Sequence, residues 1–310
     1  MSAAVLPDLV IIGAPKSGTT ALYQFLTDHP AVIGASAKET HFLSDPDSSV
    51  HRTPRKRPNF HDDTVAAYAD LWPADAHVRI EATPSYMYHR TPLEVLGDPG
   101  CATQVVVVLR RPARRVLSSY LFLRERTAVV KGVDSFAEHV ARARAGAYTG
   151  EWATQANLCI EHSRYERWLT DWSAALGDRL TIVIAEELTS SPRPVLRDLA
   201  KRLAVDPSFY DTYSFQRVNE STSVRFGSLQ RAIHRVNFGR SHHPSESFLY
   251  RTVRSAYRRL NFSSQRADGT LGDADRSALA QLDSEFGATL AWVESTLGRQ
   301  VGSWRSAING

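Results

Sequence analysis

Apolar residues occur along the chain in short continuous runs that alternate with longer amphipathic stretches. The two clearest runs, DLVIIGA at 8–14 and TQVVVVLR at 103–110, are rich in β-branched residues and typical of strands buried on both faces. Shorter runs at 31–36, at 77–83 and within 179–188 predict three further strands. Strands that alternate with helical stretches predict an α/β fold with a parallel sheet and right-handed crossovers.

The stretches between these runs have the apolar spacing of helices, with capping residues or proline at their ends. The expected helices lie at 18–29, 63–72, 112–126, 134–145, 160–175, 191–205 and 274–298. We expect Pro112 in the first turn of one helix and Asp134 as the N-cap of another. Residues 44–61 are polar and rich in proline, which predicts a loop, and residues 216–273 have little strand pattern.

The composition is that of a globular chain, with 43% hydrophobic and 23% charged residues among 310. We expect one domain over 1–310, with an α/β core at 1–205 and a mostly helical and loop region at 206–310. The net charge of +4 and the pI of about 9.1 suit an anionic ligand but do not indicate nucleic acid. Two cysteines, no signal-peptide pattern and no membrane-spanning run favour a cytoplasmic location, and the arginine- and alanine-rich composition suggests a bacterial source.

The segment GAPKSGTT, at 13–20, follows the first strand and precedes a helix. Backbone N–H groups of such a turn, together with a helix N-terminus, form an anion site, to which Thr19 and Thr20 add hydroxyl donors and Lys16 a full charge. The P-loop of nucleoside triphosphatases has lysine directly after the second glycine, where this chain has Thr19. The strand at 103–110 ends in Arg110 rather than in an aspartate that would hold Mg²⁺. Both differences favour an anion neutralised by protein cations without a metal.

Two of these segments resemble the signatures of sulfotransferases that use 3′-phosphoadenosine 5′-phosphosulfate (PAPS). PKSGTT resembles the loop that binds the 5′-phosphosulfate, and VVVVLRRPARRVLSSY resembles a strand followed by an Arg and, eight residues later, a Ser that bind the 3′-phosphate. Three further segments resemble parts of the heparan sulfate O- and N-sulfotransferases and their bacterial relatives. They are AKETHFL, IEATPSYMY and SRYERWLTDWSAALGDRLTIVIAEEL. The resemblance covers 1–205 and, loosely, 274–304. It implies a P-loop-like three-layer fold, with helices on both sides of a central parallel sheet and a helical C-terminal region.

The resemblance implies that the donor is bound by the loop, by the second signature and by a late basic loop at 217–228. The implied donor-binding residues are Pro15, Lys16, Ser17, Gly18, Thr19, Thr20, Arg110, Ser118 and Arg225. Arg is suited to this role because its planar guanidinium can donate two hydrogen bonds to one phosphate. We expect Arg111, Arg114 and Arg115 to lie on the exposed face of the helix or to add to the positive field around the site.

The resemblance also implies the catalytic groups, which are Lys16 at the bridging and leaving oxygens and Glu39 as the general base. His41 is an alternative base. If 38–42 is extended, Glu39 and His41 face the same side, so one of them could orient the other. The acceptor cleft is implied to include Lys38, Glu81, Thr83, Pro84, Ser85, Ser163 and Tyr165. Ala82 replaces a lysine of the heparan sulfate enzymes, which argues against a glycosaminoglycan acceptor.

The activity implied is transfer of a sulfonate from PAPS to a hydroxyl, or else an amine, of a carbohydrate, glycolipid or secondary metabolite, without a metal. The acceptor partner is therefore a small molecule, glycan or lipid, and no nucleic acid is expected. The basic segment 250–260 could rest on anionic lipid or be a solvated helix face. Two other functions stay open, a magnesium-dependent P-loop kinase for a small molecule and a non-catalytic module that binds an anionic nucleotide.

Overall fold

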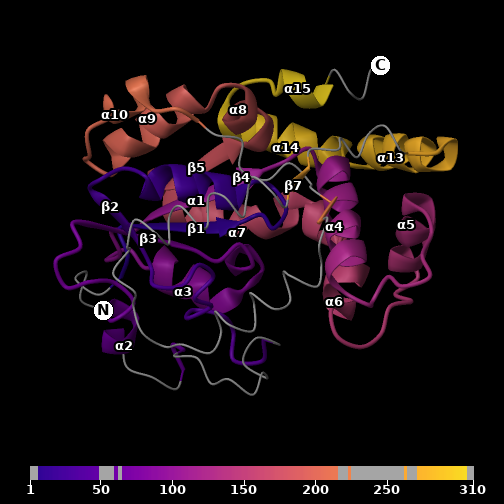
Figure 1. Ribbon diagram of the computed structural model, residues 1–310, viewed down its shortest axis with the longest axis horizontal. Coiled ribbons are helices and arrows are strands. Elements are labelled where there is room, and N and C mark those ends of the chain that lie inside the picture. Colours follow the sequence, from indigo (N-terminus) through magenta and orange to yellow (C-terminus); the bar gives the residue numbers. More distant parts are fainter. Residues whose placement is uncertain are drawn as a thin grey trace. The chain divides into compact units, whose positions relative to one another are not determined.

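The computed structural model describes residues 6–48, 59–61, 65–215, 223–224, 262–263 and 271–305. The chain divides into two compact units, one made of 1–218 and 272–310 and the other of 219–271. The first unit contains a five-stranded parallel sheet with the strand order β2-β3-β1-β4-β5 (Figure 1). In the second unit, the described residues form an antiparallel pair of two-residue strands, β6 (Ser223–Val224) and β7 (Phe262–Ser263).

The central strand of the sheet is the first in the sequence. The five strands are β1 (Leu9–Gly13), β2 (Val32–Gly34), β3 (Val78–Ala82), β4 (Gln104–Leu109) and β5 (Leu180–Ile184). Strand β1 pairs with β3 on one side and with β4 on the other, and all five of its residues are buried. The carboxyl ends of β1, β3 and β4 therefore lie next to one another, so the loops after these strands meet at one edge of the sheet.

The sheet is the middle of three layers because successive side chains of a strand point to opposite faces. Leu9 and Ile11 pack in one core, whereas Val10 and Ile12 pack in the other. The first core is covered by α1 (Thr19–Thr27), α8 (Ala185–Ser190), α9 (Pro192–Arg202) and α10 (Phe209–Thr212). The second is covered by α2 (Val65–Ala69), α3 (Arg90–Gly97), α7 (Tyr165–Leu176), α14 (Gly287–Leu297) and α15 (Gly302–Arg305). The predicted three-layer α/β fold is confirmed.

Four more helices lie together at one end of the sheet (Figure 1). They are α4 (Pro112–Arg126), α5 (Phe136–Arg144), α6 (Ala153–Asn157) and α13 (Asp273–Glu285), and α13 packs against both α4 and α5. Short 3₁₀ turns are η2 (Tyr86–Tyr88), η3 (Glu161–Ser163) and η4 (Gly177–Arg179). The C-terminal helices thus contact the helix that directly follows β4.

All five predicted strands are present, and the differences from the sequence pattern concern helix ends and helices that were not predicted, such as α3 and α6. The helix expected at 274–298 is two helices, α13 and α14, which meet at Phe286. The expected Asp134 cap is wrong, because the Ser135 hydroxyl caps α5 by accepting the Glu138 N–H at 3.1 Å. The helix expected at 160–175 begins as the 3₁₀ turn η3 and becomes α-helical only at α7.

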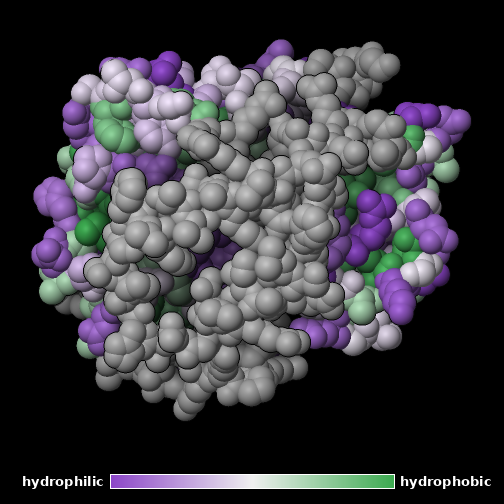
Figure 2. All heavy atoms as spheres, viewed as in Figure 1, coloured by the Kyte–Doolittle hydropathy of each residue, from purple (hydrophilic) through white to green (hydrophobic). Residues whose placement is uncertain are grey.

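The described surface mixes hydrophilic and hydrophobic residues, as Figure 2 shows for one face. Trp152 and Leu158 are the large apolar side chains that are exposed, and both follow α5. Among the described residues, no helix is both long and apolar enough to cross a membrane.

Candidate active site

The loop after β1 turns sharply between the strand and α1. Gly13 has no room for a side chain, since a Cβ there would lie 2.3 Å from Met87 Sδ. Gly18 is the N-cap of α1 and adopts a left-handed φ of 97°, which glycine accepts without a steric penalty. Ser17 and Thr19 are buried on either side of it. The N-terminus of α1, which is the positive end of the helix dipole, therefore lies at a tight turn of the loop. A helix N-terminus that follows such a turn is the usual arrangement of an anion-binding site.

Backbone strain in the described residues is concentrated at the predicted catalytic groups. Five residues other than glycine have a positive φ, namely Lys16 (71°), Glu39 (62°), His41 (56°), Trp152 (69°) and Ala204 (53°). Residues with a Cβ disfavour this region, and conformations of this kind are concentrated at functional sites. Three of the five are the residues that the sequence singles out for catalysis, so the strain is an independent indication of the same site.

Lys16 lies in a partly buried position beside α4. Its Nζ is 4.1 Å from the centre of the Phe122 ring, a cation–π contact. The pKa of Lys16 is lowered to about 8, mainly by burial and further by the positive charges of Arg126 and Arg110, while Glu125 and Glu39 oppose the shift. The ammonium group is therefore short of counter-charge, and a bound anion would raise its pKa.

Arg110 reaches the loop from the neighbouring strand. It follows β4 directly, and its Nη1 lies 3.5 Å from the carbonyl oxygen of Lys16. The Tyr165 hydroxyl donates to the Arg110 carbonyl oxygen at 2.7 Å and so fixes the backbone at the strand end. Ser118 is a buried residue in the middle of α4, the helix that begins two residues after Arg110. The structure thus brings together the loop and the strand-end arginine.

The segment that contains Glu39 and His41 lies against the end of β3. The Glu39 N–H donates to the Ala82 carbonyl at 3.0 Å, and the His41 N–H approaches Thr83 Oγ1 at 3.3 Å. Lys38 Nζ donates to Glu39 Oε1 at 2.9 Å, and His41 Nε2 is 4.0 Å from Glu39 Oε2. The segment is not extended, because Glu39 and His41 have left-handed backbones, yet their side chains still approach one another.

The predicted acceptor residues at the end of β3 and in the turn after it are mostly enclosed by protein. Glu81, Thr83 and Pro84 are buried, and Ser85 is partly exposed. Burial raises the pKa of Glu81 to about 7, although hydrogen bonds from Thr40, Thr83 and Tyr86 oppose the shift. The Glu81 side chain has no exposed surface, so its carboxylate faces other protein groups. The sequence analysis assigned Glu81 to the acceptor cleft together with Thr83, Pro84 and Ser85, because the motif does not show which of these side chains are buried.

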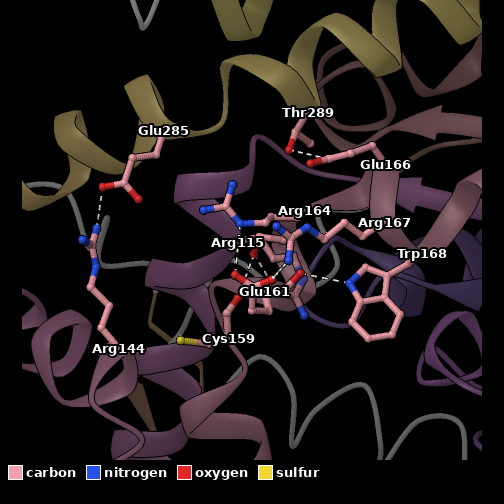
Figure 3. Close-up of polar contacts among 11 residues, drawn as sticks. Arg115, Arg144, Cys159, Glu161, Arg164, Glu166, Arg167, Trp168, Glu285 and Thr289 are labelled. Atoms are coloured by element: carbon pink, nitrogen blue, oxygen red, sulfur yellow. Dashed lines mark hydrogen bonds and ion pairs between the residues drawn. The ribbon is translucent and has the colours of Figure 1, made fainter.

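Ser163 and Tyr165 also lie inside the protein. The Ser163 hydroxyl accepts a hydrogen bond from Arg115 Nη1 at 2.8 Å, and Tyr165 is bound to the Arg110 carbonyl. Arg115 is itself buried, contrary to the expected exposed face, and donates to the Cys159 carbonyl (Figure 3). It also donates to the Tyr88 hydroxyl at 3.0 Å. Through these contacts Arg115 joins α4 to η3 and to the turn after β3.

The C-terminal helices support the end of β4, which the sequence pattern did not predict. Arg111, also expected to be exposed, donates from Nε to Asp283 Oδ1 at 2.7 Å and from Nη2 to Asp283 Oδ2. Glu186 accepts the Arg111 N–H at 3.1 Å and the Trp304 indole N–H at 2.9 Å. Figure 3 shows two more links from these helices, Arg144 to Glu285 and Thr289 to Glu166. Residues far along the chain thus hold Arg111 in place next to Arg110, the predicted ligand of the 3′-phosphate.

Some predicted residues lie outside the part of the chain that the structure describes. These are Arg225 in the late basic loop and the basic segment 250–260. Among the described residues, no group of three His, Cys, Asp or Glu side chains is arranged to hold a metal ion.

Comparisons with known proteins give a consistent result. Residues 7–91 match a family described as "Sulfotransferase family". The chain is 31% identical over 267 residues to heparan sulfate glucosamine 3-O-sulfotransferase 3A1 of Mus musculus, covering 83% of this chain and 61% of that protein. It is 28% identical over 274 residues to the 3B1 enzyme of Homo sapiens, covering 85% and 64%. The chain therefore spans less than two thirds of the length of these curated relatives.

Among solved structures, the chain is similar to a sulfotransferase from Alicyclobacillus acidocaldarius. The TM-score is 0.60 at 19% sequence identity, and the match covers 97% of this chain and 99% of that one. At this identity the match supports the fold.

Proposed function

Because this chain belongs to the sulfotransferase family, we propose that it transfers a sulfonate group from PAPS to a hydroxyl group of a carbohydrate, glycolipid or secondary metabolite. The observation that carries the proposal is the approach of Arg110 Nη1 to within 3.5 Å of the Lys16 carbonyl oxygen. A donor with a phosphosulfate at one end and a 3′-phosphate on its ribose needs two neighbouring anion-binding groups. The loop at 13–20 and the strand-end arginine are such a pair.

In this proposal the loop amides, Thr19 and Thr20 bind the 5′-phosphate, while Arg110 and Ser118 bind the 3′-phosphate. Lys16 neutralises charge on the leaving oxygen during in-line transfer. Its burial supports that role, because a cation is most effective where water is largely excluded and where the surrounding charges do not fully neutralise it.

Glu39 is the proposed general base, and His41 and Lys38 hold its carboxylate. The electrostatic influence of Glu39 on Lys16 supports this assignment, since a base must lie near the reacting centre. His41 Nε2, 4.0 Å from Glu39 Oε2, can orient the carboxylate. Glu39→Gln should therefore abolish transfer with donor binding intact, whereas His41→Asn should reduce it less; the reverse order would make His41 the base.

Ala82 leaves the cleft without the lysine that the heparan sulfate enzymes carry there. The relatives named above act on glucosamine of heparan sulfate, as their names state, but we propose an acceptor with less negative charge. A transfer assay with ³⁵S-labelled PAPS should use desulfated heparan sulfate, a neutral alkyl glucoside, and the pair glucosamine and N-acetylglucosamine. Label on both members of the pair indicates a hydroxyl acceptor, and label on glucosamine alone indicates an amine.

The decisive binding test compares adenosine 3′,5′-bisphosphate with ATP plus magnesium by thermal shift. Glu81 makes this comparison necessary, because it is an acid at the end of β3, next to β1, where a magnesium-dependent kinase would need one. Its enclosure supports the sulfotransferase alternative. We expect stabilisation by adenosine 3′,5′-bisphosphate and little by ATP plus magnesium. Stronger stabilisation by ATP plus magnesium would refute the proposal.

A further inference from the structure

Glu81 sits at the centre of a group of hydroxyls that no motif assigned to a common role. Its Oε1 accepts hydrogen bonds from Thr83 Oγ1 at 2.7 Å and from Thr40 Oγ1, and its Oε2 accepts one from the Tyr68 hydroxyl. The Tyr86 hydroxyl lies 3.3 Å from Thr40 Oγ1. We call these four residues, Thr40, Tyr68, Thr83 and Tyr86, the hydroxyl cage. All four are buried, as is Glu81.

The hydroxyl cage also holds the backbone of the segment after Glu39. The N–H groups of His41, Phe42 and Leu43 point to three cage hydroxyls, with distances of 3.3, 3.2 and 2.9 Å to Thr83 Oγ1, Thr40 Oγ1 and the Tyr86 oxygen. Three consecutive amides therefore depend on side-chain oxygens. Since a buried amide without a partner is costly, this backbone needs those oxygens in place.

A hydroxyl has one proton to donate and lone pairs that accept, so its two functions are coupled. When Thr40 and Thr83 donate to the carboxylate, their lone pairs are left for the amides of Phe42 and His41. A carboxylate only accepts, so an ionised Glu81 orients both hydroxyls in this sense. A group that donates to them would compete with the amides for the same oxygens.

We propose that Glu81 is a positioning residue, whose carboxylate orients the cage hydroxyls and thereby keeps Glu39 and His41 in their left-handed backbone conformations beside Lys16. This inference deepens the proposed function and rests on it for the catalytic role of Glu39. The left-handed values of φ, 62° for Glu39 and 56° for His41, are of the kind that persists only where the surroundings hold it. The enclosure of the carboxylate excludes a direct acceptor contact in this conformation.

The charged and titratable groups around Glu81 are consistent with this role. Tyr68 approaches from α2, Tyr86 from η2, and Tyr23 of α1 is close enough for the carboxylate to raise its pKa. No lysine or arginine is among the described groups that influence the pKa of Glu81. Hydroxyls alone support its charge, so the network is sensitive to the removal of any one donor.

Two variants of the full-length protein test the proposal. Glu81→Gln keeps the size of the side chain but introduces an N–H₂ that donates to the cage. Tyr68→Phe removes one hydroxyl on the far side of the carboxylate and keeps the ring that stacks on Phe42 at 4.3 Å. His29→Gln is the matched control, because His29 is a buried polar residue bound to the Asp206 carbonyl at 3.1 Å, in the turn between α1 and β2.

Hydrogen–deuterium exchange gives a readout that needs no substrate. At pH 8, above the pKa of Glu81 of about 7, we expect faster exchange in peptides covering 40–44 for both variants, with unchanged exchange in β1 and β4, and no such local change for His29→Gln. Unchanged exchange at 40–44 in Glu81→Gln would overturn the proposal. This result is independent of whether the protein uses PAPS, so the proposed function and this inference can fail separately.

Turnover gives the second readout, as release of adenosine 3′,5′-bisphosphate from PAPS with the acceptor from the panel, or with water if none is found. We expect kcat to fall about a hundredfold in Glu81→Gln and less in Tyr68→Phe, since small displacements of a catalytic group cost this much. The KM for PAPS should stay within about twofold, because the donor loop is not part of the cage. Equal kcat in wild type and Glu81→Gln would refute the role. If wild type releases no product, the proposed function fails and the exchange result alone decides the positioning.

Discussion

Glu81 allows a quantitative prediction of how stability depends on pH. Its pKa is raised from 4.5 to about 7 in the folded protein, mainly by burial. The folded state therefore binds a proton more tightly than the unfolded state between these two values. Because of this, the stability from Glu81 is fully present below pH 4.5 and is lost as pH rises to about 7. A shift of this size corresponds to about 3 kcal/mol.

Glu81→Gln removes this titration without changing the size of the side chain. Replacing the carboxylate also alters the hydrogen bonds of the hydroxyl cage, a cost that does not depend on pH. We therefore expect the variant to be less stable than wild type near pH 4.5, and the difference in unfolding free energy to move by about 3 kcal/mol in favour of the variant between pH 4.5 and pH 8. Urea unfolding at several pH values measures the difference, with fluorescence of the six tryptophans as the signal. All other carboxyl groups titrate in both proteins, so their contributions cancel in the difference.

A difference that does not change between pH 4.5 and 8 would show that burial does not dominate the environment of Glu81. A change with pH of the opposite sign would show that the hydroxyl cage stabilises the charge more than water does. Either result would refute this reasoning about the pKa. It would leave open the geometric argument for positioning, which exchange at 40–44 tests.

Two further predictions concern the donor site. Lys16→Ala should reduce the rate of sulfonate transfer by about a thousandfold. The melting temperature of the variant should stay the same or rise, because a cation whose pKa is lowered by burial costs stability. A parallel loss of stability and activity would contradict the catalytic role of Lys16. Asp283→Asn should destabilise the protein by about 3–5 kcal/mol and weaken binding of adenosine 3′,5′-bisphosphate, because the Arg111 side chain, which is only 12% exposed, loses the buried carboxylate that accepts two of its hydrogen bonds. The control is Asp273→Asn on the same helix, whose pair with Arg276 is exposed and should contribute less than about 1 kcal/mol; equal effects of the two substitutions would exclude a special role for the buried pair.

The sheet and the anion loop could be predicted because their signals are local. A run such as VVVVL is buried on both faces wherever it is placed, and Gly18 is suited to the left-handed turn that starts α1. The approach of Arg110 to the loop follows from the same logic, since β1 and β4 are neighbours with their carboxyl ends together.

The helices that the sequence did not predict depend on distant residues. The N-terminus of α3 is capped by Asp45, whose carboxylate accepts the N–H groups of Arg90 at 3.0 Å and Thr91 at 2.7 Å. This cap lies 45 residues before the helix, so no local pattern could indicate it. Short α6 begins after Trp152, a residue with a left-handed φ of 69° that is not a usual helix cap.

The roles of the arginines after β4 were mistaken for a related reason. Nothing in the local sequence distinguishes Arg111 and Arg115 from exposed helix residues. They are enclosed because they bind Asp283 of α13 and Ser163 of η3, which are distant in the sequence. Glu81 and Tyr165 were likewise predicted to line the acceptor cleft, but both are buried, and their burial depends on how α2, η2 and β4 pack around them. Sequence motifs therefore indicated a candidate site and left open which side chains face a substrate.

The clamp on Arg111 has a consequence for how the protein is made. Asp283 is 172 residues beyond Arg111, and Trp304 binds the same Glu186 that accepts the Arg111 N–H. On the ribosome, the strands of this sheet, the last of which ends at Ile184, emerge long before Asp283 and Trp304 do. A nascent chain that has folded its sheet would still lack these two side chains, so the end of β4 would gain its full support only after the last of these helices has left the exit tunnel.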